Sequence, residues 1–346
     1  MADKAGEKIK GHKAALAGYS SGKRGLLFTD DKWIVKHMPA VEERLRGLTA
    51  TPSKRATEIS QHMVFGSGKR LRPAFTLAGY LLVAEGLSPQ AVDLAACSEL
   101  VHCASLFHDD VIDSSLSRKG QPSANAIWGN RTAVVTGDYI FAIAFSVISK
   151  LKRQDISDEY IDVACSLGEG VILEIEKNSD PDITEEEYLD IISRKTAGFF
   201  RTATRTGAML AGAPKEQTDA AGRFAYHFGM AFQITDDVLD LYSDEGQTGK
   251  PRGLDIREGV YTLPVIYALR CDDGSLRERL CRNGDIDDAD IDFMADRVEV
   301  SGGLAYALER AQDYHHRALE DLGELPPSES HCFLERIANK IISRRF

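Results

Sequence analysis

Two short acidic motifs carry the clearest chemistry in this sequence. They are Asp109-Asp110-Val-Ile-Asp113 and Asp236-Asp237-Val-Leu-Asp240, each at the end of an apolar stretch. On a helix, residues i and i+4 project from one face, so the first and last carboxylates of each motif would stand together. Such charges repel unless cations lie between them, and Mg2+ prefers carboxylate and phosphate oxygens. One copy would equally suit an exposed acidic helix end, but two copies predict a divalent-metal site between facing helices.

Basic residues gather in four groups, each at a predicted helix end or in a loop. The groups are Lys69/Arg70/Arg72, Arg118/Lys119, Arg194/Lys195 and Lys250/Arg252. Arginine offers forked donors and lysine a point charge, and both suit phosphates. Most such groups are ordinary surface charges. In a chain with a formal net charge of −11, however, basic groups near acidic motifs are less ordinary. They predict contacts to an anionic substrate that carries phosphates.

Four uncharged or weakly basic residues near the motifs have both a functional and a structural interpretation. His102 lies seven residues before Asp109, on the same helix face, and could bond an anionic group or serve only as a core histidine. Gln233, one turn before the second motif, could bond a ligand or the backbone. Ala104 and Ser105 lie about one turn before Asp109, where small side chains could open a passage or allow close helix packing.

Two familiar motifs are excluded. The segment Gly66-Ser-Gly68-Lys69-Arg70 is not a nucleotide-binding loop, because Met63 occupies a required glycine position and no strand precedes the segment. Glu99-x-x-His102 is half of a di-iron signature, and the chain contains no second copy.

The length of 346 residues alone would suggest about two domains, but the pattern along the chain predicts one helical domain. Residues 1–30 are small and polar, and we expect a flexible N-terminal arm. Residues 31–346 show helical periodicity without a linker or an alternating strand pattern, which predicts an all-α bundle of roughly ten or more helices. Helices are expected over 90–113 and 215–242, each ending in an acidic motif. Another should run unbroken from the capping box at Thr184 to Ala211.

Composition also indicates the compartment and excludes some partners. The acidic balance disfavours nucleic acid and anionic membrane surfaces. Six cysteines without CxxC spacing are typical of reduced thiols in a cytoplasmic protein. No signal-peptide pattern is present, and no run reaches the roughly 18 apolar residues of a membrane span. We therefore expect a cytoplasmic protein without stable membrane insertion.

Taken in order, these motifs resemble those of the trans-isoprenyl diphosphate synthases over about residues 30–345. The resemblance rests on Gly68-Lys69-Arg70-Leu-Arg72-Pro73, His102, the two acidic motifs, Arg118-Lys119-Gly120, Lys195-Thr196, Gln233 and Gly249-Lys250-Pro251. It implies the isoprenoid synthase fold around a central cavity, usually as a homodimer. It also implies Mg2+-assisted, head-to-tail condensation of isopentenyl diphosphate with an allylic diphosphate.

The resemblance assigns a role to each matching residue. Both acidic motifs would bind Mg2+ directly or through water, Asp109, Asp113 and Asp236 foremost, and Lys195 would act with them. Lys69, Arg72 and His102 would hold isopentenyl diphosphate. Arg118, Lys195 and Lys250 would hold the allylic diphosphate, with Thr196 and Gln233 nearby. Lys119 replaces the arginine usual in the family, so it keeps the charge for isopentenyl diphosphate but loses the forked geometry.

Product length is expected to depend on the helix before Asp109. The carbocation requires an apolar cavity that excludes water. Synthases that stop at farnesyl diphosphate typically carry a bulky aromatic residue where this chain has Ala104 and Ser105. A geranylgeranyl or longer polyprenyl diphosphate is therefore expected, with Phe141 and Phe145 on a neighbouring helix as candidates for the cavity floor.

Three other functions share part of the pattern. A class I terpene cyclase and a head-to-head synthase also use prenyl diphosphates, but neither needs the second diphosphate site implied by Lys69, Arg72 and His102. A non-catalytic subunit of a heteromeric synthase would be expected to lose one acidic motif, and both are intact here.

Overall fold

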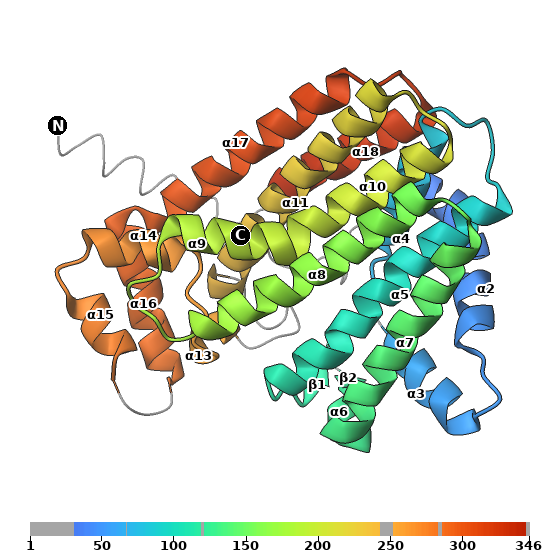
Figure 1. Cartoon of the computed structure of the whole chain (residues 1–346). Helices are drawn as coiled ribbons and strands as arrows, with labels where there is room; N and C mark the ends of the chain where they lie inside the picture. Colours follow the sequence, from blue (N-terminus) through green and yellow to red (C-terminus); the bar gives the residue numbers. More distant parts are fainter. Residues whose placement is uncertain (1–30, 67, 119–120, 243–251, 283–285, 344–346) are drawn as a thin grey trace.

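The computed structural model describes residues 31–66, 68–118, 121–242, 252–282 and 286–343. The expected N-terminal arm, Lys119 and Lys250 lie outside these residues. Within them the chain is almost entirely helical (Figure 1), so the all-α prediction is confirmed. One short hairpin, β1 (Ser117–Arg118) paired with β2 (Gln121–Pro122), is the only sheet in the part of the chain described.

The helices follow one another with short connections. In the first half they are α2 (Lys32–Thr49), α3 (Lys54–Val64), α4 (Leu71–Leu81), α5 (Pro89–Ile112), α6 (Ala124–Trp128), α7 (Asn130–Lys150) and α8 (Gln154–Glu176). In the second half they are α9 (Glu185–Ile192), the π-helix η1 (Ser193–Ala197), α10 (Gly198–Leu210), α11 (Lys215–Tyr242), α13 (Leu254–Arg257), α14 (Leu263–Cys271), α15 (Ser275–Leu280), α16 (Asp288–Ser301), α17 (Gly303–Gly323) and α18 (Glu329–Ile342).

Helix α5 is the central helix that carries the first acidic motif. It begins where the Ser88 side chain accepts a hydrogen bond from the Ala91 N–H, with Pro89 in its first turn. Buried apolar residues lie on all sides of the helix, and Leu94, Leu100 and Phe107 are fully buried. A helix that is apolar on every side belongs in the interior of a bundle, and this placement carries the motif at its last turn to the edge of the core.

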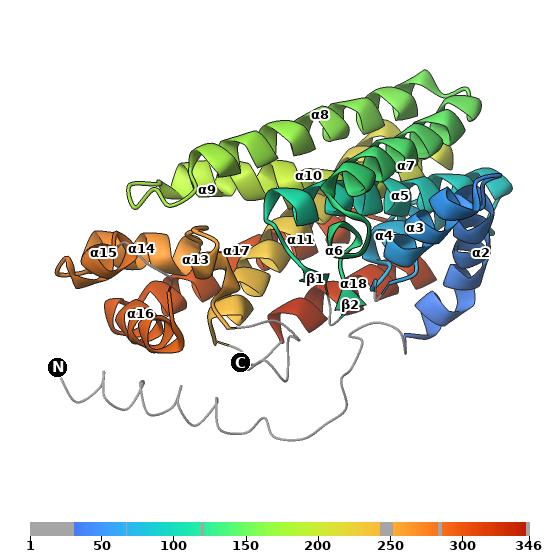
Figure 2. The same cartoon turned by 90° about the horizontal axis from the view of Figure 1, so that it is seen from below.

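The buried side chains form two clusters. The larger one includes residues of α4, α5, α7, α8 and α10. The smaller one includes residues of α9, α11, α14, α16 and α17. Figures 1 and 2 show α13 to α16 gathered at one end of the molecule, next to the part of α11 that carries the second acidic motif. The second motif therefore lies beside the smaller cluster, which includes Ile234, Val238 and Leu241.

Two glycines let α4 and α10 touch along their backbones. A Cβ atom on Gly79 would lie 2.1 Å from the carbonyl oxygen of Thr204, and one on Gly207 would lie 2.0 Å from that of Thr76. No larger residue fits at either position without separating the helices. The contact fixes α10 against α4 and thereby positions the basic residues at their ends.

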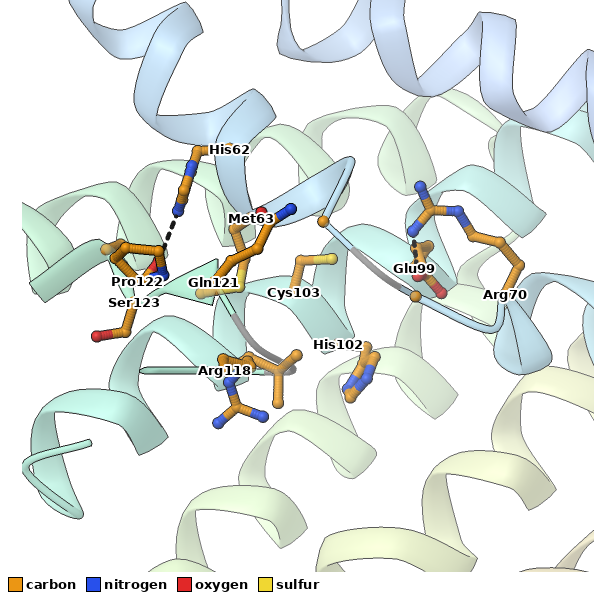
Figure 3. A pocket seen from close by; sticks show the side chains of 14 residues that line it. His62, Met63, Arg70, Glu99, His102, Cys103, Arg118, Gln121, Pro122 and Ser123 are labelled. Carbon is orange, nitrogen blue, oxygen red and sulfur yellow. Dashed lines mark hydrogen bonds and ion pairs between the residues drawn. The ribbon is translucent and has the colours of Figure 1, made fainter. Parts of the chain in front are cut away.

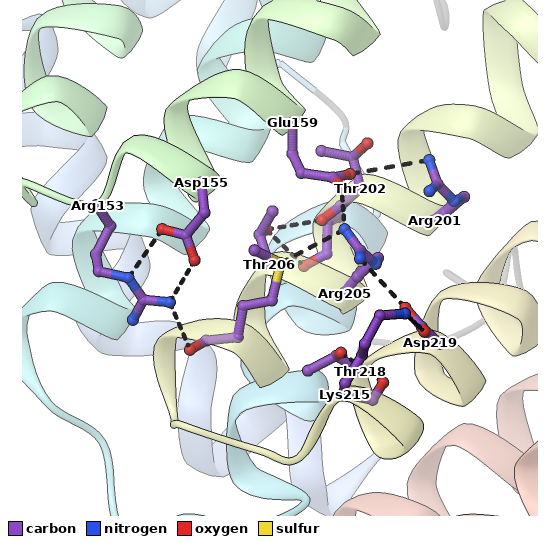
Figure 4. Close-up of polar contacts among 12 residues, drawn as sticks. Arg153, Asp155, Glu159, Arg201, Thr202, Arg205, Thr206, Lys215, Thr218 and Asp219 are labelled. Atoms are coloured by element: carbon purple, nitrogen blue, oxygen red, sulfur yellow. Dashed lines mark hydrogen bonds and ion pairs between the residues drawn. The ribbon is translucent and has the colours of Figure 1, made fainter.

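A polar network joins three helices at the end of α10 that is remote from the acidic motifs (Figure 4). The guanidinium of Arg205 on α10 pairs with Glu159 on α8. It also donates to Asp219 on α11 over 3.2 Å. Because this arginine is only partly exposed, the network holds the helices together in addition to interacting with solvent.

The structure differs from the expected elements in one place that matters for function. The capping box at Thr184 is present, but the expected continuous helix to Ala211 is interrupted by η1. A π-helix adds one residue to a turn, changes the register of the residues that follow, and frequently marks a functional site. Arg194, Lys195 and Thr196 lie within it.

Candidate active site

The three carboxylates of the first motif have different surroundings. Asp110 is buried, at 1% exposed. Its Oδ1 accepts hydrogen bonds from Nε of Arg118 at 2.8 Å and from Nη2 at 2.7 Å. The hairpin brings Arg118 back to this position. Asp109 is half-buried and Asp113 is exposed, so these two carboxylates can face a ligand at the end of α5.

Asp110 is therefore fixed mainly by contacts with other residues of the protein. Besides its bonds to Arg118, its backbone carbonyl accepts a hydrogen bond from Nδ2 of Asn125 over 3.0 Å. Its second carboxylate oxygen, Oδ2, is buried without a partner among the described residues. This oxygen is the one atom of Asp110 that could still interact with a cation.

Lys195 links the π-helix to the first motif. Its ammonium group pairs with Glu174 on α8. Burial would lower the pKa of Lys195, but the charges of Glu174 and Asp109 outweigh burial and raise it, so the side chain stays cationic. Burial likewise raises the pKa of Asp109 to about 6, against the opposing effects of Lys195 and Arg118. The site therefore combines a half-buried cation with a carboxylate whose charge is incompletely neutralised.

The second motif is tied to the π-helix by hydrogen bonds. Gln233 donates from Nε2 to Oδ1 of Asp237 over 2.7 Å. Its own Oε1 accepts from the Thr196 hydroxyl over 2.8 Å. The Tyr188 hydroxyl donates to Oδ2 of Asp237 over 2.6 Å. Asp237 is thus enclosed, with both oxygens accepting hydrogen bonds.

The other two carboxylates of the second motif are more accessible. Asp236 is exposed and Asp240 is half-buried. One oxygen of Asp240 accepts a hydrogen bond from the Asp255 N–H over 3.2 Å. Asp236 and Asp240 are therefore the members of this motif that can face a bound ligand.

A pocket opens beside α5, between α3, the segment before α4 and the hairpin (Figure 3). Its lining residues are His62, Met63, Gly66, Gly68, Arg70, Glu99, His102, Cys103, Leu106, Arg118, Gln121, Pro122, Ser123 and Ala124. The ring of His62 donates to the carbonyl of Pro122 over 2.9 Å, which joins α3 to the hairpin. The pocket thus brings His102 and Arg118 together beside the Gly68–Arg70 segment.

Arg70 and Arg72 play different parts although they are close in sequence. Arg70 has a positive φ of 52° and donates to Glu99 over 2.7 Å, so its charge is balanced inside the protein. Arg72 lies with its guanidinium 5.0 Å from the ring centre of Phe199. Burial lowers its pKa to about 10, and its Nε has no partner among the described residues. Arg72 is therefore the better candidate to receive an anionic ligand.

The proposed chain-length residues come from two adjacent helices. Ala104 is fully buried, and the half-buried Ser105 donates to the backbone carbonyl of His102 over 2.9 Å. On α7, the rings of Phe141 and Phe145 stack with centres 6.2 Å apart.

Tyr188 and Glu174 are site residues that sequence reasoning did not single out. Tyr188 meets Asp237 across 49 positions of sequence and Glu174 meets Lys195 across 21. A tyrosine seven residues before Lys195 would share a helix face with it, which is the only signal that the sequence offers. Neither contact follows from a local motif.

No three His, Cys, Asp or Glu side chains converge closely enough to hold a metal ion by themselves, within the residues that the structure describes. The donors present are nevertheless carboxylate oxygens, which suit hard divalent cations. Asp109 has a pKa raised by burial, and Oδ2 of Asp110 has no partner. These residues fit a divalent cation that takes its remaining ligands from phosphate groups and water.

Fold and site together define an all-α enzyme with two acidic motifs, a half-buried lysine and a pocket with basic residues. The profile of the polyprenyl synthetase family matches residues 53–297. The chain therefore belongs to the polyprenyl synthetase family. It is a trans-prenyl diphosphate synthase, an enzyme that transfers prenyl groups.

Named relatives differ in product length. An all-trans-nonaprenyl-diphosphate synthase (geranyl-diphosphate specific) of Rhodobacter capsulatus is 40% identical over 271 residues, which cover 78% of this chain and 83% of that protein. A short chain isoprenyl diphosphate synthase of Methanothermobacter thermautotrophicus is 32% identical over 317 residues, covering 89% of this chain and 97% of that protein. These similarities therefore leave the product length of this enzyme open.

The fold is also that of solved synthases. The polyprenyl synthase of Caulobacter crescentus, complexed with calcium and isoprenyl diphosphate, superposes with a TM-score of 0.86 at 29% identity. The match covers 95% of this chain and 100% of the Caulobacter crescentus chain. The similarity therefore extends over the whole helical domain.

Proposed function

We propose that this enzyme condenses isopentenyl diphosphate head-to-tail with an allylic diphosphate, using Mg2+, and releases a geranylgeranyl or longer polyprenyl diphosphate. The observation that carries the proposal is the position of η1. Its Lys195 pairs with Glu174 and interacts electrostatically with Asp109 and Asp113, and its Thr196 is bonded through Gln233 to Asp237. One π-helix thus interacts with both acidic motifs, as expected if a single diphosphate lies between them.

Mg2+ fits the carboxylates that remain accessible. Asp109, Asp113, Asp236 and Asp240 are half-buried or exposed. When bound, Mg2+ would neutralise the charge that develops on the departing diphosphate. Asp110 and Asp237, which are buried and already hydrogen-bonded, would act chiefly by orienting their neighbours.

The chemistry requires binding and exclusion of water rather than a nucleophilic side chain. The allylic carbon–oxygen bond breaks with its electron pair on the diphosphate, which Lys195 and Arg118 would hold. The double bond of isopentenyl diphosphate attacks the resulting cation, and a proton then leaves the adjacent carbon. Charged donors placed where charge develops lower the barrier because they need no reorganisation. Released pyrophosphate is a suitable acceptor for that proton.

The pocket beside α5 supports a separate site for isopentenyl diphosphate. His102 lines it, Lys69 lies in the segment that borders it, and the guanidinium of Arg72 is buried nearby with an unsatisfied Nε. Lys119 follows Arg118 in the sequence and Lys250 belongs to a later loop, so both are proposed ligands from segments outside the described residues. A second diphosphate site favours condensation over terpene cyclisation, which needs only one.

We also propose that the enzyme is a homodimer in the cytoplasm. Helix α7 has the length and hydropathy of a membrane span, whereas no such segment was expected from the sequence. Only 39% of its apolar window is buried inside the protein. Val135 on α7 and Ile161, Ile172 and Ile175 on α8 are exposed apolar residues, and we propose that a second copy covers them. Sedimentation of the purified protein as a monomer would contradict the dimer.

The function is tested by supplying purified enzyme with Mg2+, radiolabelled isopentenyl diphosphate and a series of allylic primers. The expected result is a ladder or single species of longer prenyl diphosphates, formed only when both substrates are present. A cyclic hydrocarbon made from the allylic substrate alone would indicate a cyclase. No product without an added second protein would indicate a subunit of a heteromeric synthase.

Substitution of His102 and of Lys195 should separate the two substrate sites. We expect His102→Ala to raise KM for isopentenyl diphosphate, because the imidazole lines the pocket beside α5. Lys195→Ala should instead raise KM for the allylic primer, because its ammonium group interacts electrostatically with Asp109. Each loss of one charged hydrogen bond should cost roughly ten- to a hundredfold. Equal effects of either variant on both Michaelis constants would refute the assignment.

A further inference from the structure

The second acidic motif contains a carboxylate that points into the protein. Asp237 is only 5% exposed, and each of its oxygens accepts a short hydrogen bond, one from Tyr188 and one from Gln233. The neighbouring Asp236 is exposed. Two adjacent carboxylates on one helix therefore have opposite surroundings, and only that of Asp236 is exposed to solvent.

We propose that Tyr188 is a positioning residue that fixes the second acidic motif, and that Asp237 is the buried link between them rather than a metal ligand. This inference rests on the proposed function, because it assigns the metal-facing role in that motif to Asp236 and Asp240. It adds a residue outside the acidic and basic motifs to the machinery of the enzyme.

The hydrogen bonds join α11 to two consecutive elements, α9 and η1. Tyr188 belongs to α9, Thr196 to η1, and Gln233 and Asp237 to α11. The sequence of contacts runs from the Thr196 hydroxyl to Gln233, from Gln233 to Asp237, and from Asp237 to Tyr188. A helix held on two sides in this way cannot rotate about its axis without breaking a contact, so the direction of Asp236 is fixed.

The same network relates the second motif to the half-buried cation. Lys195 precedes Thr196 in the π-helix and pairs with Glu174. A shift of Asp237 would be transmitted through Gln233 to Thr196 and so to the backbone that carries Lys195. Tyr188 therefore helps to set the distance between the lysine and the carboxylates on either side of a bound diphosphate.

A tyrosine hydroxyl suits this position because it can donate to a buried carboxylate. Tyr188 is itself only 4% exposed, and hydrogen bonds to an ionised acceptor are shorter and stronger than neutral ones. Phenylalanine would keep the ring packing but leave Oδ2 of Asp237 buried without its donor. Groups that orient metal ligands in this way typically change metal affinity or activity by roughly 10–100-fold when they are removed.

Tyr188→Phe tests the proposal, with Tyr226→Phe as its matched control. The Tyr226 hydroxyl donates to Ser193 in η1 over 3.0 Å and has no hydrogen bond to Asp237 among the described residues. Kinetics with both substrates should be combined with calorimetric binding of Mg2+ and inorganic pyrophosphate. For Tyr188→Phe we expect roughly 10–100-fold weaker binding of Mg2+ with pyrophosphate, a comparable loss in kcat/KM for the allylic primer, and an unchanged KM for isopentenyl diphosphate.

Tyr226→Phe should behave as the unmodified enzyme in every assay. If the two phenylalanine variants are indistinguishable, Tyr188 has no positioning role. An equal rise in both Michaelis constants would also contradict the proposal, because it would indicate general loosening of the fold.

A second comparison keeps Tyr188 in place and tests the role of Asp237. Asparagine can still accept from Gln233 and bond the Tyr188 hydroxyl, so Asp237→Asn should weaken the binding of Mg2+ with pyrophosphate no more than Tyr188→Phe does. Asp236→Asn should lose this binding, because it removes a charge that faces the ligand. Equal losses in the two variants would make Asp237 a direct ligand and overturn the inference.

These binding assays do not depend on turnover. If the unmodified enzyme binds Mg2+ with pyrophosphate but makes no prenyl product, the proposed function fails while the positioning role can still be tested.

Discussion

Asp109→Ala and Asp236→Ala should each lower kcat by roughly a hundred- to a thousandfold, which is the scale of losing one electrostatic contact to a developing charge. The two residues lie on different helices, α5 and α11, and neither is buried. A divalent cation bound between the two motifs would interact with carboxylates of both. We therefore expect that neither motif can compensate for loss of the other. The measurement is steady-state condensation at saturating substrates, across a titration of Mg2+.

A matched control for these variants is Asp158→Ala. Asp158 is an exposed aspartate on α8 whose carboxylate accepts only from Gln154 over 2.7 Å, and its removal should leave activity unchanged. A chelator should abolish activity of the unmodified enzyme, and added Mg2+ should restore it. Near-normal turnover of Asp236→Ala, with its helical circular dichroism spectrum retained, would remove the second motif from the mechanism.

Much of the fold could be predicted because its signals are local. The expected helices over 90–113 and 215–242 correspond to α5 (Pro89–Ile112) and α11 (Lys215–Tyr242). Ser88 and Pro89 mark the start of α5, and its continuous apolar sequence predicts a central position. The capping box at Thr184 was equally clear. Each of these features depends on residues within a few positions of one another.

The division of labour within each acidic motif could not be predicted in the same way. Spacing alone makes Asp109 and Asp110 equivalent, but the hairpin returns Arg118 to Asp110 and leaves Asp109 accessible. That hairpin has two residues per strand, too few for an alternating pattern. The distinction between ligand and support therefore depends on tertiary contacts that no local signal records.

Arg70 shows the same limit for the basic groups. Its sequence position between Lys69 and Arg72 predicted a contact with phosphate. Its left-handed backbone conformation instead accompanies a bond from its side chain to Glu99 on α5. Net charge and spacing identify where positive residues gather, but partner carboxylates elsewhere in the chain decide which of them remain available for a substrate.

The second large effect concerns product length. Ser105→Phe should shorten the prenyl product by at least one isoprene unit while leaving both diphosphate sites intact. Ser105 lies four residues before Asp109, about one helical turn away, and is half-buried. Its hydroxyl bonds only the helix backbone at His102, so replacing it breaks no contact to another element. An aromatic ring at this position would occupy the space into which a growing chain extends from the ionisation site.

The measurement is the size distribution of products from one primer, compared among the unmodified enzyme, Ser105→Phe and Ser105→Ala. Ser105→Ala removes the hydroxyl without adding volume and should keep the original product length. Ala104→Phe should shorten the product too, but Ala104 is fully buried and overpacking typically costs about 1–3 kcal/mol, so this variant should also be less stable.

The floor of the cavity can be tested from the other side. If Phe141 and Phe145 end the passage, Phe145→Ala should lengthen the product, because it removes a ring that now stacks on Phe141. Product length that stays the same in Ser105→Phe, Ala104→Phe and Phe145→Ala would mean that the chain does not grow between α5 and α7. The passage is expected to be open because Ala104 and Ser105 are both small and cannot stop the growth of the prenyl chain. An unmodified enzyme that stops at farnesyl diphosphate would therefore contradict this expectation.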